Sequence, residues 1–335
     1  MKGKHNKINY LYNNPNLYEA LASALSHSFV NLSVREPQLI ANLVYYIPKE
    51  VNQLNLPIST LGVFVHQKPY IRYNGMAKNA RIEIGDLLLI RTLKHTDKTI
   101  SRSALLIQAK KIFPNDDISY ISKTNQNQHN LYALWPKFEF ISNPLAGITR
   151  FVTGPNLHNG SKYLLIPNSP CLQKACLHFC FIRHNCKLCR SSLTHPNICS
   201  LTAFALPQVL SNFQCFYLEL IDFILGNAGR EFIYQPANNT NWDQVITDLI
   251  NITQIQIKKL NTTSSINGAR QNGIMFCSKT SSLPSDDYLL TSNLPPPSNE
   301  YPNLSQDEPI NDGGISIIEF FIDENEIHRK SNNTS

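Results

Sequence analysis

The spacing of apolar residues predicts helices in several parts of the chain. Between residues 14 and 31 the apolar side chains recur with a period close to 3.6, which is typical of an amphipathic helix. A second helix is predicted to begin at Glu36, because Pro37 suits a first turn, where a missing N–H group costs nothing. We also predict helix over residues 202–233 and an amphipathic helix over residues 242–260.

Shorter apolar runs bounded by polar residues predict buried β-strands. Such runs occupy residues 62–67, 85–90, 105–110, 162–166 and 315–322. The polar stretch Lys94-His-Thr-Asp-Lys-Thr99 lies between the second and third runs and suits a hairpin loop. Helices and strands that alternate in this way predict an α/β protein.

Three polar residues interrupt the two strands of this predicted hairpin. A hairpin folded about Asp97 places Asp86 opposite Gln108, and directly opposed residues of an antiparallel pair point to the same face. Lys110 shares that face, because side chains alternate along a strand. A carboxylate, an amide oxygen and an ammonium group would therefore converge within an apolar framework. Since a buried charge is costly unless it is paired or bound to a metal, this convergence predicts a site.

The pattern resembles the signature of the PD-(D/E)xK nuclease superfamily, an acidic residue on one strand followed by Glu or Gln, any residue and Lys on the next. The match is Asp86 with Gln108-Ala109-Lys110, in the form that carries Gln, and it covers roughly residues 30–112. The chain departs from the signature at Gly85, where the superfamily has Pro. The resemblance implies a restriction-endonuclease-like core, with the order αβββαβ, and a metal-dependent phosphodiesterase activity.

The resemblance also assigns roles to these residues. Asp86 and Gln108 would bind Mg²⁺ or Mn²⁺, because such hard cations prefer oxygen ligands. The metal would lower the pKa of its bound water. Lys110 would orient that water or stabilise charge on the phosphate.

An acidic residue from an N-terminal helix often completes the site in this superfamily. Glu36 is the first candidate for this ligand or base, and Glu19 is its competitor. Glu36 is equally compatible with a purely structural place at a helix N-terminus, where the helix dipole favours an anion. Glu83 is a further candidate ligand, although a regular strand would turn it away from Asp86 unless the chain bulges at Gly85. His66 could approach the site, and a structural role for it stays open.

A second candidate site is a cluster of cysteines between residues 171 and 199. Cys186 and Cys189 have the CxxC spacing that lets two thiolates reach one tetrahedral zinc ion. Cys176 and Cys180 would share a helical face and could complete a structural zinc site, with His184 as a substitute ligand. An iron–sulfur cluster and a set of ordinary free thiols are the alternatives.

Composition restricts the class of protein more than its function. The chain has 335 residues, of which 42% are hydrophobic and 16% charged, as in a globular protein. It has no apolar run of the ~18 residues that a membrane span needs and no secretory signal, so we expect a cytoplasmic protein with no membrane partner. The formal net charge of +6 permits a nucleic-acid partner without requiring one.

We divide the chain into a nuclease core over residues 15–166, a mostly helical, Cys-rich region over 167–278, a linker or loop over 279–312 and a terminal strand and tail over 313–335. The expected function is Mg²⁺-dependent hydrolysis of nucleic acid, most simply DNA, and the resemblance suggests restriction or defence. The alternative is a non-catalytic, zinc-stapled protein that binds nucleic acid or acts as an adaptor. In that case Asp86 and Lys110 would only form a salt bridge that packs the sheet. Basic residues surround the proposed site in the sequence and could contact phosphates: Arg72, Lys78, Arg81, Lys94, Lys98, Arg102, Lys110 and Lys111.

Overall fold

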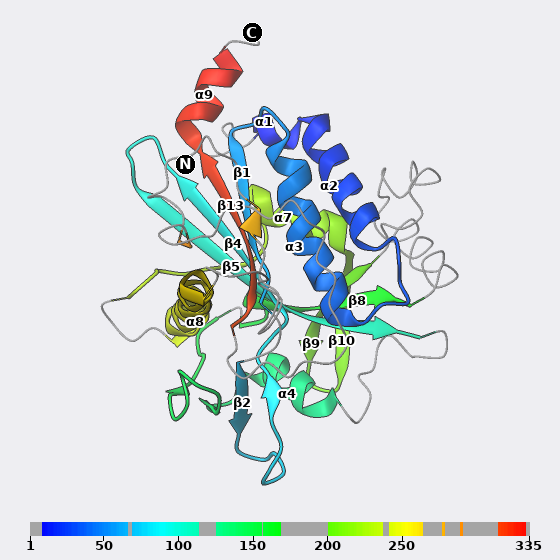
Figure 1. Cartoon of the computed structure of the whole chain (residues 1–335), viewed down its shortest axis with the longest axis vertical. Helices are drawn as coiled ribbons and strands as arrows, with labels where there is room; N and C mark the ends of the chain where they lie inside the picture. The colour runs from blue at the N-terminus through cyan, green and yellow to red at the C-terminus, as the bar shows by residue number, and fades with distance from the viewer. Residues whose placement is uncertain are drawn as a thin grey trace.

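The computed structural model describes residues 9–65, 69–113, 125–155, 157–168, 200–236, 241–263, 277–278, 289–290 and 314–332. Within them the chain forms a mixed α/β fold with one large mixed sheet, a small antiparallel sheet and helices on both sides (Figure 1). The strand order of the large sheet is β10-β9-β8-β5-β4-β13-β1-β12, and β11 pairs with β5 beside this path. Its strands are β1 (Ile58–Val63), β4 (Leu87–Lys94), β5 (Ile100–Ile112), β8 (Ser161–Pro167), β9 (Leu201–Leu206), β10 (Val209–Cys215), β11 (Arg230–Glu231), β12 (Cys277–Ser278) and β13 (Ser316–Asp323).

The hairpin of β4 and β5 has the register that the sequence predicts. Leu87 lies opposite Ile107 and Lys94 opposite Ile100. The loop between them is closed by Asp97, whose side chain accepts hydrogen bonds from the N–H and the hydroxyl of Thr99. A short polar turn with an Asp cap is therefore enough to fix the pairing of two strongly apolar strands.

The predicted terminal strand becomes β13, which lies inside the sheet between β4 and β1. It pairs in parallel with β4 and antiparallel with β1. Its apolar run Ile317-Ile-Glu-Phe-Phe-Ile322 is almost completely buried on both faces, as expected of a central strand. The first strand after helix α3 (Glu36–Asn52) is therefore separated from β4 by a segment from the far end of the chain.

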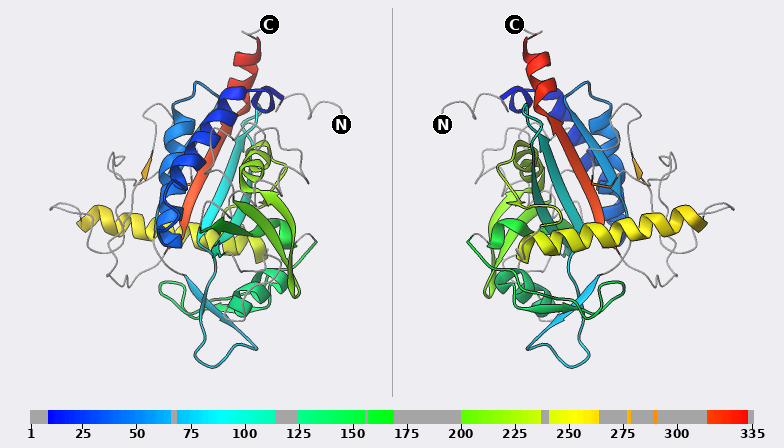
Figure 2. Two further views of the ribbon diagram at one scale, coloured as in Figure 1. Left: turned by 90° about the vertical axis from the view of Figure 1, so that its right-hand side faces the viewer. Right: turned by 90° about the vertical axis from the view of Figure 1, so that its left-hand side faces the viewer.

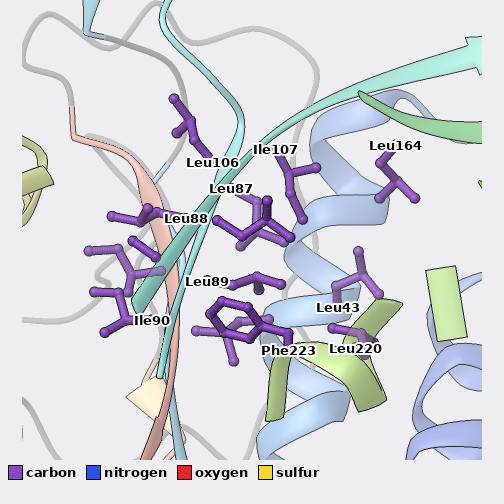
Figure 3. Close-up of a cluster of buried hydrophobic side chains, with 14 of the residues drawn as sticks. Leu43, Leu87, Leu88, Leu89, Ile90, Leu106, Ile107, Leu164, Leu220 and Phe223 are labelled. Carbon is purple, nitrogen blue, oxygen red and sulfur yellow. The ribbon is translucent and has the colours of Figure 1, made fainter. Parts of the chain in front are cut away.

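Helices cover both faces of this sheet. α3 (Glu36–Asn52) and α7 (Phe216–Leu225) lie on one side of β4 and β5, and α8 (Asn241–Thr263) lies on the other (Figure 1). The strand side chains alternate between these two sides in Figure 3. On the α3 and α7 side, the buried side chains drawn together are Leu43, Leu87, Leu89, Ile107, Leu220 and Phe223.

A small four-stranded sheet continues from one end of the large one (Figure 2). Its order is β3-β2-β6-β7, with β2 (Tyr70–Tyr73), β3 (Ile82–Glu83), β6 (Phe138–Phe140) and β7 (Thr149–Arg150). The remaining described elements are the helices α1 (Asn9–Tyr12), α2 (Pro15–Ser28), α4 (Gln126–Leu134) and α9 (Glu324–Asn332) and the short 3₁₀ helix at Leu157–Gly160. None of the described helices is long and apolar enough to cross a membrane.

The sequence prediction of helix over residues 202–233 is wrong in its first and last parts. Residues 201–215 form the antiparallel pair β9 and β10, and only Phe216–Leu225 is helical, ending at Gly226 in the left-handed conformation. The Leu-Pro-Gln turn explains the difference, because Pro207 interrupts a helix and Gln208 adopts a positive φ of 82°. The pairing of β9 with β8 then stabilises the strand conformation of these residues. The described part of residues 167–278 is therefore mixed rather than mostly helical.

The other helix predictions agree with the structure. α2 and α8 occupy the predicted stretches, and α3 begins at Glu36 with its proline in the first turn. The first predicted strand is displaced, because β1 ends at Val63, whereas the prediction began at Gly62. β1 packs under α3 so closely that a Cβ on Gly62 would lie 2.2 Å from the Val44 carbonyl oxygen.

Candidate active site

A pocket of about 190 Å³ opens at the end of the large sheet where β1 ends and β4 and β13 begin. The N-terminus of α3 forms one wall, and the segment that connects the small sheet to β4 forms another. The predicted residues Glu36, Asp86, Gln108 and Lys110 all line this pocket. Its remaining lining residues are Pro37, Ile40, Phe64, Val65, Glu83, Gly85, Gly314, Ile315 and Ser316.

Asp86 and Gln108 lie side by side, as the hairpin register predicts. The Gln108 side-chain amide donates a hydrogen bond to Oδ2 of Asp86. The backbone N–H of Ala109 donates to the same oxygen at 2.7 Å. The two side chains therefore lie on one face of the hairpin and are fixed against each other, with Gln108 only 3% exposed.

The position of Asp86 and Glu36 follows from the different lengths of the two strands. β5 continues beyond the point where β4 begins, so its N–H groups on that edge lose their strand partner. Asp86 accepts the hydrogen bond from Ala109, and Oε1 of Glu36 accepts that of Lys111 at 2.7 Å. Two carboxylates thus replace the missing strand and gather at one end of the sheet.

The structure brings Glu36, rather than Glu19, to the pocket. Glu36 is in the first turn of α3, and its Oε2 lies 3.9 Å from Nζ of Lys110. The side chains of Lys110 and Glu36 are 24% and 32% exposed, so solvent reaches the pair. Glu19 is on the exposed surface of α2 and does not line the pocket.

Glu83 also enters the pocket, because the chain does not continue as one strand from β3 to β4. β3 belongs to the small sheet, and residues 84–86 bend before β4 begins. Gly85 permits this close passage: a Cβ there would lie 2.8 Å from Leu106 and 2.9 Å from the Tyr132 hydroxyl. Gly85 is therefore the local sequence signal for this bend.

The carboxyl groups of Asp86 and Glu83 perturb each other. They are close enough to share a hydrogen bond. Burial raises the pKa of Asp86 well above its usual range, and the charge of Glu83 raises it further, while Lys110 and the Ala109 N–H act in the opposite direction. Burial also raises the pKa of Glu83, against the hydrogen bond from Asp86 and the charge of Lys110. Ionisation of both carboxyl groups would give the pocket more negative charge than Lys110 balances, so a bound cation would favour their ionised form.

The donor atoms suit a hard divalent cation. Oε1 of Gln108 is buried and accepts no hydrogen bond from the described residues. An amide oxygen and one or two carboxylates, completed by water, are a typical set of Mg²⁺ ligands. Among the described residues, no group of three or more His, Cys, Asp and Glu side chains is arranged to hold a metal ion. Any cation here would thus depend on Asp86, Gln108 and solvent, with Glu83 beside them.

Comparison of the chain with protein-family models, with curated proteins and with solved structures gives no match. Its function is therefore argued from the pocket itself.

One wall of the pocket was not predicted from the sequence. Ser316, at the start of β13, accepts a hydrogen bond from the N–H of Val65 at 3.4 Å and donates one to its carbonyl oxygen at 3.0 Å. Thr253 of α8 fixes the preceding residue through two hydrogen bonds to the backbone of Ile315. The sequence around residue 316 does not predict that Ser316 lines the pocket, because this depends on which strands β13 pairs with.

The predicted basic residues have different surroundings. Lys94 and Lys98 belong to the far end of the β4–β5 hairpin, and Nε of Arg102 is buried. Arg72 pairs with Glu139 at 3.2 Å, and Arg81 lies over the ring of Tyr70. Lys111 points away from the pocket toward the backbone before α3.

The predicted zinc ligands Cys176, Cys180, Cys186 and Cys189 lie outside the described residues, as does His66. Cys215, at the end of β10, is buried and is not part of a disulfide in the described part of the chain.

Proposed function

We propose that this protein is a metal-dependent nuclease that hydrolyses phosphodiester bonds of nucleic acid, most simply DNA. The observation that carries the proposal is that Asp86, Gln108 and Lys110 line one open pocket, with Asp86 and Gln108 hydrogen bonded across a hairpin. A salt bridge that only packed the sheet would be covered by side chains. Here Lys110 is partly exposed and pairs with Glu36 rather than with Asp86.

We also propose that the fold is related to the restriction-endonuclease-like core. The elements α3, β1, β4, β5, α4 and β8 follow each other in the order αβββαβ once the small sheet is set aside. β13 is then an addition, inserted between the first and second core strands. This assignment also rests on the Gln-x-Lys pattern and its register.

In this proposal Asp86 and Gln108 hold the cation, and Glu83 adds negative charge beside it. A bound Mg²⁺ or Mn²⁺ would supply a water of lowered pKa and would neutralise charge on the phosphate. The Ala109 N–H and the Gln108 amide fix the Asp86 carboxylate, so the ligand oxygen has little freedom. Such preorganisation matters, because binding then requires little rearrangement of the protein.

Lys110 would act on the reacting phosphate. Its ammonium lies in the pocket beside three carboxyl groups, and the pairing with Glu36 keeps it directed there. An ammonium group so placed can stabilise the negative charge that develops on phosphate oxygens or orient the attacking water. Removing it should thus affect the reaction more than the binding of the cation.

The small sheet is the proposed nucleic-acid contact beside the pocket. Its strand β3 ends at Glu83 in the pocket, and the loop from β2 to β3 carries the exposed residues Lys78 and Arg81. Cations on a projecting hairpin can neutralise backbone phosphates, which makes binding salt-dependent. A role in restriction or defence remains part of this proposal and rests on the family resemblance.

The test is cleavage of plasmid, linear duplex and single-stranded DNA, and of RNA, by the purified full chain with Mg²⁺ or Mn²⁺. Asp86→Asn should abolish cutting, and EDTA should do the same. Asp97→Asn is the matched control, because Asp97 is in the same hairpin at its far end. Cutting that survives in Asp86→Asn or in EDTA would contradict the proposal. Nucleic-acid binding without cutting would favour the non-catalytic alternative.

A further inference from the structure

Lys111 connects β5 to the loop that precedes α3. Its ammonium group donates hydrogen bonds to the carbonyl oxygens of Leu32 at 2.6 Å and Val34 at 3.0 Å. Its backbone N–H donates to Glu36, two residues beyond that loop. One residue thus holds both the approach to the helix and the acidic side chain at its start.

Among the described residues, the start of α3 lacks one common anchor. Its N-cap residue, Arg35, makes no side-chain capping hydrogen bond in the described structure. Helices usually have such a cap, and its absence weakens the first turn. The lysine therefore supplies, from a strand, part of the fixation that a capping side chain normally provides.

Lys110 and Lys111 are neighbours on β5 and have different roles. Since side chains alternate along a strand, Lys110 reaches the pocket while Lys111 reaches the loop. Glu36 lies between them, with Oε2 near Lys110 and Oε1 on the N–H of Lys111. A movement of the loop that shifts the start of α3 would therefore displace Glu36 from the pocket and from Lys110.

We propose that Lys111 is a positioning residue, which holds the loop at residues 32–34 so that the Glu36 carboxylate stays at the pocket and contributes to cation binding. This inference rests on the proposed function, because it takes the pocket to be a cation site. It assigns Lys111 no contact with the substrate. It also makes Glu36 part of the electrostatic attraction for the cation.

The direction in which one substitution changes the cation affinity distinguishes this role from simple electrostatics. Lys111→Met keeps the aliphatic stem and removes a positive charge near the carboxylates. By Coulomb attraction alone, that loss should strengthen binding of a divalent cation. If Lys111 instead positions Glu36, the substitution should weaken binding. Loss of a partner that orients a metal-binding group typically lowers metal affinity by roughly 10-fold or more.

The experiment is a calorimetric titration of the full chain with Mn²⁺ in the absence of nucleic acid. The variants are Lys111→Met, Glu36→Gln and the double variant, with thermal unfolding recorded for each. Lys330→Met is the matched control, because Lys330 also donates to a backbone carbonyl, that of Asn55 at 2.8 Å, at the opposite end of β13 from the pocket. Lys111→Arg keeps the donors and should restore binding if Lys111→Met folds poorly.

We expect Mn²⁺ affinity to fall roughly 10-fold in Lys111→Met, to stay unchanged in Lys330→Met and to recover in Lys111→Arg. In the double variant the loss should equal that of Glu36→Gln alone, because both substitutions remove the same interaction. Unchanged or tighter binding by Lys111→Met, or a loss that adds fully to that of Glu36→Gln, would overturn the inference while leaving the proposed function standing. A wild-type chain that binds no Mn²⁺ would overturn both.

Discussion

Asp86 and Glu36 each accept a hydrogen bond from a backbone N–H group that β5 exposes beyond its partner strand. Because both carboxylates accept hydrogen bonds at the same edge of β5, this arrangement also concentrates negative charge in one pocket. The sequence could predict the pairing of Asp86 with Gln108, because a short hairpin has few registers. It could not decide between Glu36 and Glu19, since that choice depends on which helix end meets the edge of β5.

At the residue scale, Asp86→Asn should raise stability at pH 8 while abolishing activity. The raised pKa of Asp86 means that ionising it costs more in the folded state than in the unfolded chain. This cost is absent near the unfolded pKa of about 4 and grows as pH rises toward the higher folded pKa. The new amide can still accept the Ala109 N–H and can donate to Glu83.

Calorimetric unfolding at pH 5 and pH 8, with and without Mg²⁺, checks this prediction. At pH 8 without metal the melting temperature of the variant should exceed that of the wild type by a few degrees, and the difference should shrink at pH 5. Mg²⁺ should stabilise the wild type only, because a ligand stabilises the state that binds it. A variant less stable than the wild type at pH 8 would contradict the expectation that ionised Asp86 destabilises the folded state.

At the scale of elements, local pattern and turn chemistry predicted the β4–β5 hairpin and the helices α2, α3 and α8. The β9–β10 pair was missed because its small and apolar residues fit a helix as well as a strand, and pairing with β8 decided the outcome. The position of β13 was also not predictable. Its partners lie far along the chain, and a hydrogen bond from Val65 to Ser316 spans 251 residues.

Within β13, Glu319 should make stability fall as the pH rises from about 4.5 to about 7. Its side chain is fully buried and accepts hydrogen bonds from Thr92 at 2.8 Å and the Leu289 N–H at 3.1 Å. Burial raises its pKa from 4.5 to about 7, against the hydrogen bond from Thr92 and the charge of Arg102. Between these two pKa values the folded state keeps a proton that the unfolded chain has lost, so the free energy of unfolding falls over this pH range by up to about 3 kcal/mol and levels off above it.

Glu319→Gln should remove this part of the pH dependence. Denaturant unfolding between pH 5 and pH 8 should show a smaller loss of unfolding free energy than in the wild type. Glu139→Gln is the control, because Glu139 forms a solvent-accessible pair with Arg72. Equal pH slopes for Glu319→Gln and the wild type would show that Glu319 is not protonated in the folded state at low pH.

At the scale of the whole molecule, the large sheet is continuous only when the C-terminal strand β13 is in place. β13 separates β4 from β1, and its first residue lines the pocket together with α3 and β5. Residues from the start, the middle and the end of the sequence thus meet at one site. A division into a nuclease core and a separate terminal strand describes the sequence but not the packing of the described elements.

Truncation should show this dependence directly. A chain ending before Gly314 lacks a central strand, so β4 and β1 would expose their facing edges and apolar surface. We expect no cooperative thermal transition by circular dichroism. A chain ending after Asp323 loses only α9 and the tail, and should unfold cooperatively at a lower temperature. Cooperative unfolding of the shorter chain would contradict the central role of β13.

Lys110→Met tests whether the pocket is a metal-dependent phosphodiesterase site. The measurement is the single-turnover cleavage rate at saturating Mn²⁺ on the best substrate of the panel, for the variant and the wild type. We expect a rate reduced by roughly 10²-fold or more, with Mn²⁺ bound at least as tightly, because the charge of Lys110 opposes that of the cation. Equal cleavage rates for the two proteins would show that Lys110 takes no part in cleavage at this pocket.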